Sequence, residues 1–292
     1  MTIKKISALL LLSVLPLGVL TAQEEKDYLP KAGDWAIGID MQPVYEFFGN
    51  LFYTGEGGAW DRNTIDEFGG KDAFGLVQHS LMGKYMLSDQ LAIRANIGFG
   101  KDVQNSFRYV QDDYDKYINP FSEAQVIDYR KWKVSATSFA LGAEYRKGKD
   151  RIQGFFGADL LLGTAKNTNT YSYGNAITEI NQTPSRNLGY NPGNAAYLNG
   201  ERITETFDKS ISFGIAGRVG VEYFVVPKLS FGGELSITAF ETWEIQEYQK
   251  SEGWNKVAGG VEEHTELILP GDRSFHAGTE NLGGKLFMMF YF

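Results

Sequence analysis

The chain has 292 residues, a formal net charge of −8 at pH 7 and no cysteine. The absence of cysteine excludes disulfides and thiolate metal sites, and the acidic balance argues against nucleic acid as a partner, because phosphates attract basic surfaces. A chain of this length holds either two soluble domains or one large β-structure.

The N-terminus has the three parts of a secretory signal peptide. Lys4 and Lys5 precede an apolar run over residues 6–20, and Ala22 supplies a small residue at the expected cleavage position. The run is shorter than the ~20 apolar residues that a membrane-spanning helix needs. We therefore predict that residues 1–22 are cleaved and that residues 23–292 form the mature protein. An uncleaved N-terminal anchor is the alternative.

Eight stretches in which apolar residues alternate with small or polar ones follow in chain order. They occupy residues 34–42, 77–87, 91–100, 138–145, 155–163, 211–223, 229–238 and 282–292. A period of two is typical of β-strands, and about 9–11 residues suffice for a tilted strand to cross a hydrocarbon layer. Short turns alternate with long polar connections, which are predicted as four external loops at about 44–74, 102–128, 166–209 and 247–275.

Each stretch has an apolar face and a second face of small and charged residues. The charges on the second face are Lys84, Arg94, Glu144, Asp159, Arg218, Glu222, Glu234 and Lys285. A lipocalin-like soluble barrel would bury apolar residues and expose charges, whereas here the apolar face requires lipid around it. The interior of an eight-stranded barrel is just wide enough for side chains. We therefore predict a paired structural network rather than a gated ion path.

The last stretch ends on an aromatic residue. Its outward positions are Leu286, Met288, Phe290 and Phe292. The segment resembles the C-terminal insertion signal of bacterial outer-membrane β-barrels, in which alternate positions before a terminal Phe are apolar. Phe287 and Met289 depart from that pattern, because the inward face more often carries polar residues.

With these strands assigned, the chain resembles the small eight-stranded bacterial outer-membrane β-barrel family that includes OmpX and the barrel domain of OmpA. The resemblance rests on the strand number and on the alternation of long and short connections. It implies an all-β fold, namely an eight-stranded antiparallel up-and-down transmembrane β-barrel in the outer membrane of a Gram-negative bacterium. Outer-membrane lipid and the barrel assembly machinery are the implied partners, and no peptidoglycan-binding domain is expected.

The expected function is non-enzymatic, with external loops presented for binding or adhesion, or a role in membrane integrity. The extracellular ligand or outer-membrane protein partner stays open. A narrow porin-like channel is one alternative, and a lipid A-modifying enzyme that uses His79 is another. His79 and Ser80 point to opposite faces of their strand, which disfavours a catalytic pair. No catalytic residue and no cofactor is expected.

Two segments resemble metal sites only weakly. His264 follows Glu262 and Glu263 but lacks the spacing of a zinc motif. The acidic run at residues 112–115 lacks the glycine and the closing glutamate of a calcium loop, so a solvated acidic turn is the simpler prediction.

Aromatic residues at both ends of the strands are expected to anchor the depth of the barrel in the membrane. Those near the short turns are Tyr85, Tyr145, Tyr223 and Phe290, and those toward the loops are Trp132, Phe240 and Trp243. The third predicted loop is rich in Tyr, Asn and Gly, which is the composition of an adaptable recognition surface or of a mobile cover.

Overall fold

The computed structural model describes residues 28–41, 80–188 and 199–292, and this part of the chain is built almost entirely of β-strands. They are β1 (Trp35–Asp40), β2 (Ser80–Met86), β3 (Leu91–Gln111), β4 (Gln125–Lys149), β5 (Ile152–Ser172), β6 (Asn199–Val226), β7 (Leu229–Asn255), β8 (Gly260–Leu269) and β9 (Arg273–Tyr291). One short helix, α4 (Asp113–Ile118), follows β3. The predicted signal peptide at residues 1–22 and the first predicted loop at 44–74 lie outside the described residues.

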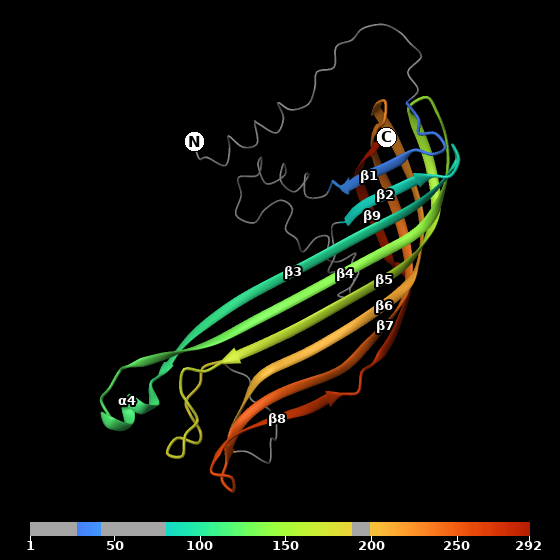
Figure 1. Cartoon of the computed structure of the whole chain (residues 1–292). Helices are drawn as coiled ribbons and strands as arrows, with labels where there is room; N and C mark the ends of the chain where they lie inside the picture. The colour runs from blue at the N-terminus through green and yellow to red at the C-terminus, as the bar shows by residue number, and fades with distance from the viewer. Residues whose placement is uncertain (1–27, 42–79, 189–198) are drawn as a thin grey trace, which may run out of the picture.

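Eight of the strands pair into a closed antiparallel ring. Neighbours in sequence pair from β1 to β7, β7 pairs with β9, and β9 pairs with β1. β8 pairs with the far end of β7 and lies outside the ring. Figure 1 shows β1 and β2 beside only one end of the long strands, whereas α4 and β8 lie at the other end. The sheet therefore closes at the end that contains the short turns and continues beyond the ring.

The register around the ring is staggered. A path that starts at Tyr223 on β6 and moves from each residue to its partner on the next strand returns to β6 at Phe213, 10 residues from its start. That offset is about 33 Å along the strand, and eight strand spacings span about 38 Å, so the strands tilt by roughly 40° from the ring axis. Each residue along a strand therefore adds about 2.5 Å of height.

Side chains alternate strictly between the two faces of the ring. On β1, residues 35, 37 and 39 are exposed and residues 36, 38 and 40 are buried. Leu, Ile, Phe and Val occupy most exposed positions of the other strands, whereas the buried positions hold charged residues, small residues and a cluster of larger apolar ones. The apolar face thus points outward along the ring, as the sequence pattern predicts.

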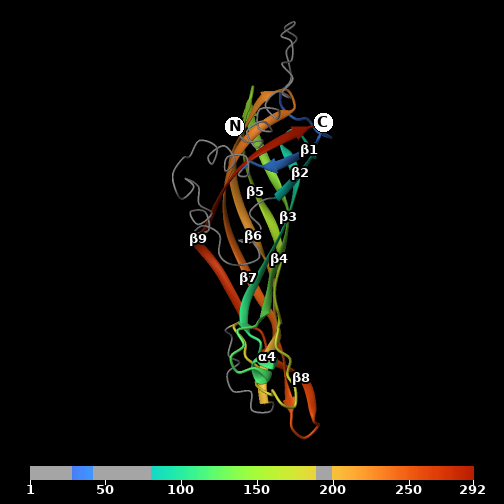
Figure 2. The same ribbon diagram turned by 90° about the vertical axis from the view of Figure 1, so that its left-hand side faces the viewer.

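The strands reach farther than the sequence analysis predicts. β3 continues to Gln111, β5 to Ser172, and β6 begins at Asn199, so much of the predicted loops at 102–128 and 166–209 is sheet. The predicted loop at 247–275 contains the end of β7, all of β8 and the start of β9. Figure 2 shows this extended sheet narrowing toward α4 and β8.

The physical reason for this correction is that the extended segments lack the sustained apolar alternation of the ring strands. Apolar alternation marks a strand only where one face is kept from water. Residues 164–172 and 202–207 are rich in Thr, Tyr, Ile and Phe, which favour extended backbone, and their backbones continue the pairing begun inside the ring. No helix in the described ranges is long and apolar enough to cross a membrane.

Candidate functional site

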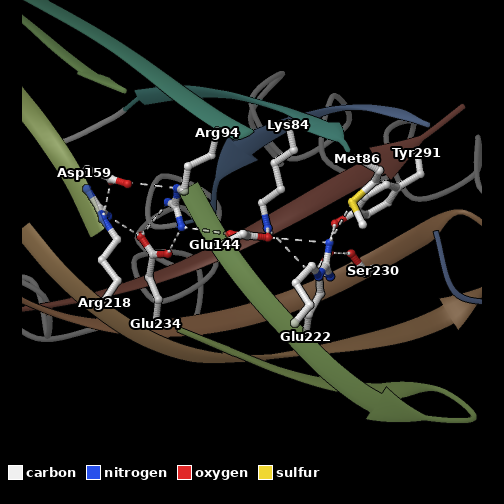
Figure 3. A network of polar contacts seen from close by, with 11 residues as sticks. Lys84, Met86, Arg94, Glu144, Asp159, Arg218, Glu222, Ser230, Glu234 and Tyr291 are labelled. Carbon is white, nitrogen blue, oxygen red and sulfur yellow. Dashed lines mark hydrogen bonds and ion pairs between the residues drawn. The ribbon is translucent and has the colours of Figure 1, made fainter. Parts of the chain in front are cut away.

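The inward-facing side chains of the ring form a buried network of charges (Figure 3). The eight residues singled out from the sequence all face the interior: Lys84, Arg94, Glu144, Asp159, Arg218, Glu222, Glu234 and Lys285. Six of them are buried, and the side chains of Arg218 and Lys285 retain 12% and 18% exposure. Apart from the pair that Lys285 forms, their ion pairs fall into two groups joined by Arg94.

The first group surrounds Glu222. Lys84 Nζ lies 2.9 Å from Glu144 Oε1 and 3.4 Å from Glu222 Oε2. Arg146 forms a close ion pair with Glu222, and its Nη1 lies 3.6 Å from Glu144 Oε1. The Tyr291 hydroxyl donates to Glu222 Oε1 at 2.9 Å and accepts from Arg146 Nη1 at 2.5 Å. Lys84 and Arg146 therefore share the carboxylates of Glu144 and Glu222. The Tyr291 hydroxyl bridges Arg146 and Glu222.

The second group surrounds Glu234. Arg94 donates to both carboxylate oxygens, with Nη1 at 2.9 Å from Oε2 and Nη2 at 3.3 Å from Oε1. Arg218 lies on the other side, 2.6 Å from Glu234 and 2.5 Å from Asp159. Arg94 Nη1 also lies 3.3 Å from Glu144, which belongs to the first group. Bidentate arginine–carboxylate contacts of this kind are geometrically specific.

Two charged members of the network were missed in the sequence analysis. Arg146 follows Glu144 by two residues on an uninterrupted strand, so the same alternation that placed Glu144 inside could have placed Arg146 there. Asp40 is buried and lies 3.7 Å from Lys285 Nζ. With these two included, the network formed by the described residues of the ring has five basic and five acidic side chains, and their formal charges cancel.

Apolar side chains fill the interior beside the charges. The buried cluster consists of Ala36, Met82, Met86, Ala92, Phe155, Phe224, Phe287, Met289 and Tyr291. Lys84 Nζ lies 4.9 Å from the ring centroid of Phe155 and 5.3 Å from that of Phe287, within range of cation–π attraction. Phe287 and Met289, the departures from the terminal pattern, therefore pack inside the ring.

The four outward positions of the terminal pattern lie on the opposite face of β9 or directly after it. Leu286, Phe290 and Phe292 are exposed, and Met288 is partly exposed. They face away from the network and contribute nothing to it. Their role as an insertion signal stays a prediction.

The aromatic residues expected near the loops divide between the two faces. Trp243 faces outward and contacts Phe213 edge-on, with ring centroids 5.0 Å apart. Phe240 is buried and stacks on His276 at 5.2 Å. Trp132 shares the inward alternation of Glu144. The prediction of an outward position was therefore wrong for Phe240 and Trp132, because it used proximity to the strand end rather than residue parity.

The acidic run at residues 112–115 stabilises local structure. Asp112 caps α4, with Oδ1 accepting from the backbone N–H groups of Tyr114 at 3.0 Å and Asp115 at 3.1 Å. Asp113 Oδ2 accepts from the side chain of Asn181 at 2.8 Å. In the described ranges no three His, Asp or Glu side chains gather as metal ligands, and His264 lies on exposed β8. His79 lies outside the described residues.

Part of the third predicted loop, residues 173–188, is fixed onto the extended sheet. Buried Asp128 on β4 accepts from the backbone N–H of Gly174 at 3.0 Å and from that of Asn187 at 2.8 Å. The Tyr173 hydroxyl donates to the Ile203 carbonyl at 2.6 Å, and burial raises the pKa of Tyr173 to about 12. We name residues 173–188, α4 and the extended ends of β3 to β8 the head.

The head buries four apolar side chains. Val110, Ile177, Leu188 and Ile203 are buried there. Arg202 is also buried in the head, with its guanidinium over the Tyr173 ring and its Nε 2.8 Å from Glu252. The described part of the third predicted loop is thus packed against the sheet, and its role as an adaptable surface or a mobile cover stays a prediction.

The class that emerges is a closed antiparallel ring with charges inside and apolar residues outside. The chain matches no protein-family model and no curated protein sequence. It is similar to the solved structure of the outer membrane protein OprG from Pseudomonas aeruginosa, at 12% identity over 91% of this chain and 98% of that chain, with a TM-score of 0.34. It is also similar to a major outer membrane protein from Thermus thermophilus, at 13% identity over 89% of this chain and 100% of that chain, with a TM-score of 0.35. TM-scores this low support no inference about the function of this chain.

Proposed function

We propose that this chain is an integral outer-membrane protein whose eight-stranded transmembrane β-barrel carries the head outside the membrane as a non-enzymatic binding or adhesion surface. A closed sheet leaves no unpaired backbone groups facing lipid, which is the condition for spanning a bilayer with strands. The barrel assembly machinery would insert it, and outer-membrane lipid would surround it.

The observation that carries this proposal is the height of the outward apolar band. On β3, the outward residues Leu91 to Phe99 are all apolar, and Lys101 is the first outward charge. The 10 residues from Leu91 to Lys101 give a height of about 25 Å at the tilt derived above. An apolar band about 25 Å tall is what an outer-membrane barrel requires.

The aromatic residues near the short turns support the same depth. Cross-strand register puts Tyr85, Tyr145, Tyr223 and Phe290 within about 4 Å of one height. All four belong to the outward alternation. Aromatic rings gather at such a level because their amphipathic edges suit the membrane interface.

The neutral interior network favours this function over a porin-like channel. Five basic and five acidic side chains pair across a ring whose lumen also holds Phe155, Phe287 and Met289. Opening an ion path would require separating buried pairs, which costs several kcal/mol for each pair broken. We therefore assign the network to stability.

The packed head favours surface presentation as the role. Beyond Lys101, β3 continues for 10 further residues, which is about 25 Å of height above the apolar band. Several large aromatic side chains are exposed there, including Tyr114, Tyr117 and Phe121. A packed head that bears exposed aromatic residues suits protein or ligand recognition.

Cell fractionation and gel mobility test the proposal. The protein should sediment with the outer membrane and migrate differently on SDS gels before and after boiling, because a closed hydrogen-bonded sheet resists SDS when cold. Recovery as a soluble periplasmic protein would refute it. Labelling of a cysteine introduced at Phe121 in intact cells should then succeed with an impermeant reagent, whereas a cysteine introduced at Lys149 should label only after lysis.

A further inference from the structure

Five lysines lie on the outward face of β3 to β6, directly above the apolar band: Lys101, Lys131, Lys133, Lys166 and Lys209. We name them the lysine belt. Lys101, Lys131 and Lys166 are exposed, and Lys133 and Lys209 are partly exposed. All five share the outward alternation of the apolar residues on the same strands, so they face whatever surrounds the barrel at that level.

Cross-strand register makes four of these lysines contiguous. Lys166 on β5 pairs directly with Lys209 on β6. Lys101 pairs with Ser135, two residues from Lys133, and Lys133 pairs with Thr168, two residues from Lys166. Direct partners have Cβ atoms about 5 Å apart and diagonal partners about 7–8 Å. The belt therefore runs unbroken across four strands.

Like charges that face each other across a sheet destabilise it unless an anion lies between them. None of the five lysines forms an ion pair with a residue that the structure describes. Glu205, a nearby acid, is already held by Lys250 at 3.2 Å and by Tyr248 at 3.0 Å. Lys166 Nζ contacts the Phe207 ring at 4.6 Å, which adds no negative charge.

Two acidic residues of the same strand segments lie on the other face. Asp102 and Asp208 belong to the inward alternation, and Asp208 accepts from Asn167 at 2.9 Å. Buried Asp128 serves the head. At this height the described strand segments therefore direct the five lysines outward, and Asp102 and Asp208 inward.

The lower end of the belt lies at the height of the headgroup layer of a bilayer, and the backbones of the other lysines lie above it. Lys101 is two residues above Phe99, which ends the apolar band on β3, and the stagger of the ring places Lys209 about 9 Å higher than Lys101. The polar layer extends about 5–8 Å beyond the hydrocarbon on each side. Lysine stems reach down along apolar surface while the ammonium stays in the polar layer.

We propose that the lysine belt binds the phosphate groups of a bisphosphorylated glycolipid in the outer leaflet. The inference rests on the proposed function, since it requires the barrel to span the membrane. Lys166 and Lys209 bracket one phosphate from adjacent strands. Lys101 and Lys133 lie up to three strand spacings, about 14 Å, from Lys209, which leaves room for a second phosphate on the same headgroup.

The test compares two charge-matched variants of the full chain in zwitterionic detergent. One replaces Lys101, Lys133, Lys166 and Lys209 with Gln. The control replaces four exposed lysines off the belt, Lys116, Lys147, Lys149 and Lys256, with Gln. Each protein is titrated with bisphosphorylated lipid A, with its monophosphorylated form and with phosphatidylcholine, and bound lipid is measured by native mass spectrometry.

Bisphosphorylated lipid A should bind the belt variant at least tenfold more weakly than wild type, while the control variant binds like wild type. One lysine near an anionic lipid surface changes the binding constant by roughly fivefold. The loss of four lysines should therefore weaken binding by well over tenfold. Binding should weaken as salt rises, because exposed charges are screened. Replacing the same four lysines with Arg should preserve it.

Three results would overturn the proposal: equal binding by wild type and the belt variant, equal binding of lipid A with one phosphate or two, or equal binding of phosphatidylcholine. The gel-mobility shift on boiling is measured on every variant. Its absence in wild type would refute the barrel itself, whereas a folded wild type with phosphate-independent binding refutes the belt alone.

Discussion

Replacing Glu222 with Ala should destabilise the folded protein by about 3–5 kcal/mol, the usual cost of leaving a buried charge without its partner. Glu222 is fully buried and contacts Lys84, Arg146, Ser230 and Tyr291. Without it, the two cations retain Glu144, at 2.9 Å from Lys84 and 3.6 Å from Arg146. One uncompensated positive charge then stays inside the ring.

A second variant separates charge from packing. The double replacement Glu222→Gln with Lys84→Met removes one charge of each sign, and neutral replacement of a buried pair is often close to neutral in stability. We expect it to recover most of the loss. The coupling between the two positions should reach at least about 2 kcal/mol in a double-mutant cycle.

The assay is reversible urea unfolding in detergent, followed by tryptophan fluorescence, with the mobility shift on boiling as an independent measure of closure. Tyr291→Phe is the matched control, because it removes only a hydroxyl and should cost about 1–2 kcal/mol. A loss below about 1 kcal/mol for Glu222→Ala, or additive single replacements, would refute a tightly coupled buried network.

Four further predictions follow from the same geometry. Wild-type protein in planar bilayers should show little or no steady conductance, and a large stable open state would contradict the filled interior. Deleting Phe292 should lower the amount of protein in the outer membrane far more than its refolding yield from urea, because losing one aromatic costs only about 1.5–3 kcal/mol of apolar burial. Equal amounts of mutant and wild type in cells would show that Phe292 contributes only to packing. Replacing Asp128 with Ala should expose residues 173–188 to limited proteolysis and leave the mobility shift unchanged, since Asp128 holds that segment from outside the ring. Tyr173 should keep its hydrogen bond between pH 7 and 9, because its pKa of about 12 exceeds the ordinary value of 10.0; protection of residues 173–188 should fall only as pH rises from about 10 toward 12, and a loss below pH 9 would contradict it.

The ring was predictable from the sequence because each lipid-facing stretch carries a period-two signal. Arg94 and Glu234 are far apart in the chain, and their placement on one inner surface follows from parity alone. Residue parity determines the face of the sheet on which a side chain lies, but it gives no distance between side chains. The bidentate contact between these two residues depends on the stagger of the register, which no single strand encodes.

The head was not predictable by the same means. Residues 164–172 and 247–255 show no apolar alternation, since both faces of the sheet are polar there, and they read as loop. Asp128 illustrates the difficulty. Its role depends on backbone groups 46 and 59 residues away in sequence, and a carboxylate in a polar stretch gives no sign of such partners.

The seam between β1 and β9 has a consequence for how the ring must form. The backbones of Trp35 and Phe292 exchange two hydrogen bonds, at 3.0 and 2.9 Å, although nearly the whole chain separates them. Because contacts of such long sequence separation carry the largest loop-closure cost, the six-residue strand β1 should join last. The strand pairings of the closed ring are the same whichever strand joins last. Topologically the ring is a cycle, so a chain joined at this seam and reopened at the turn near Asp150 would contain the same set of paired strands.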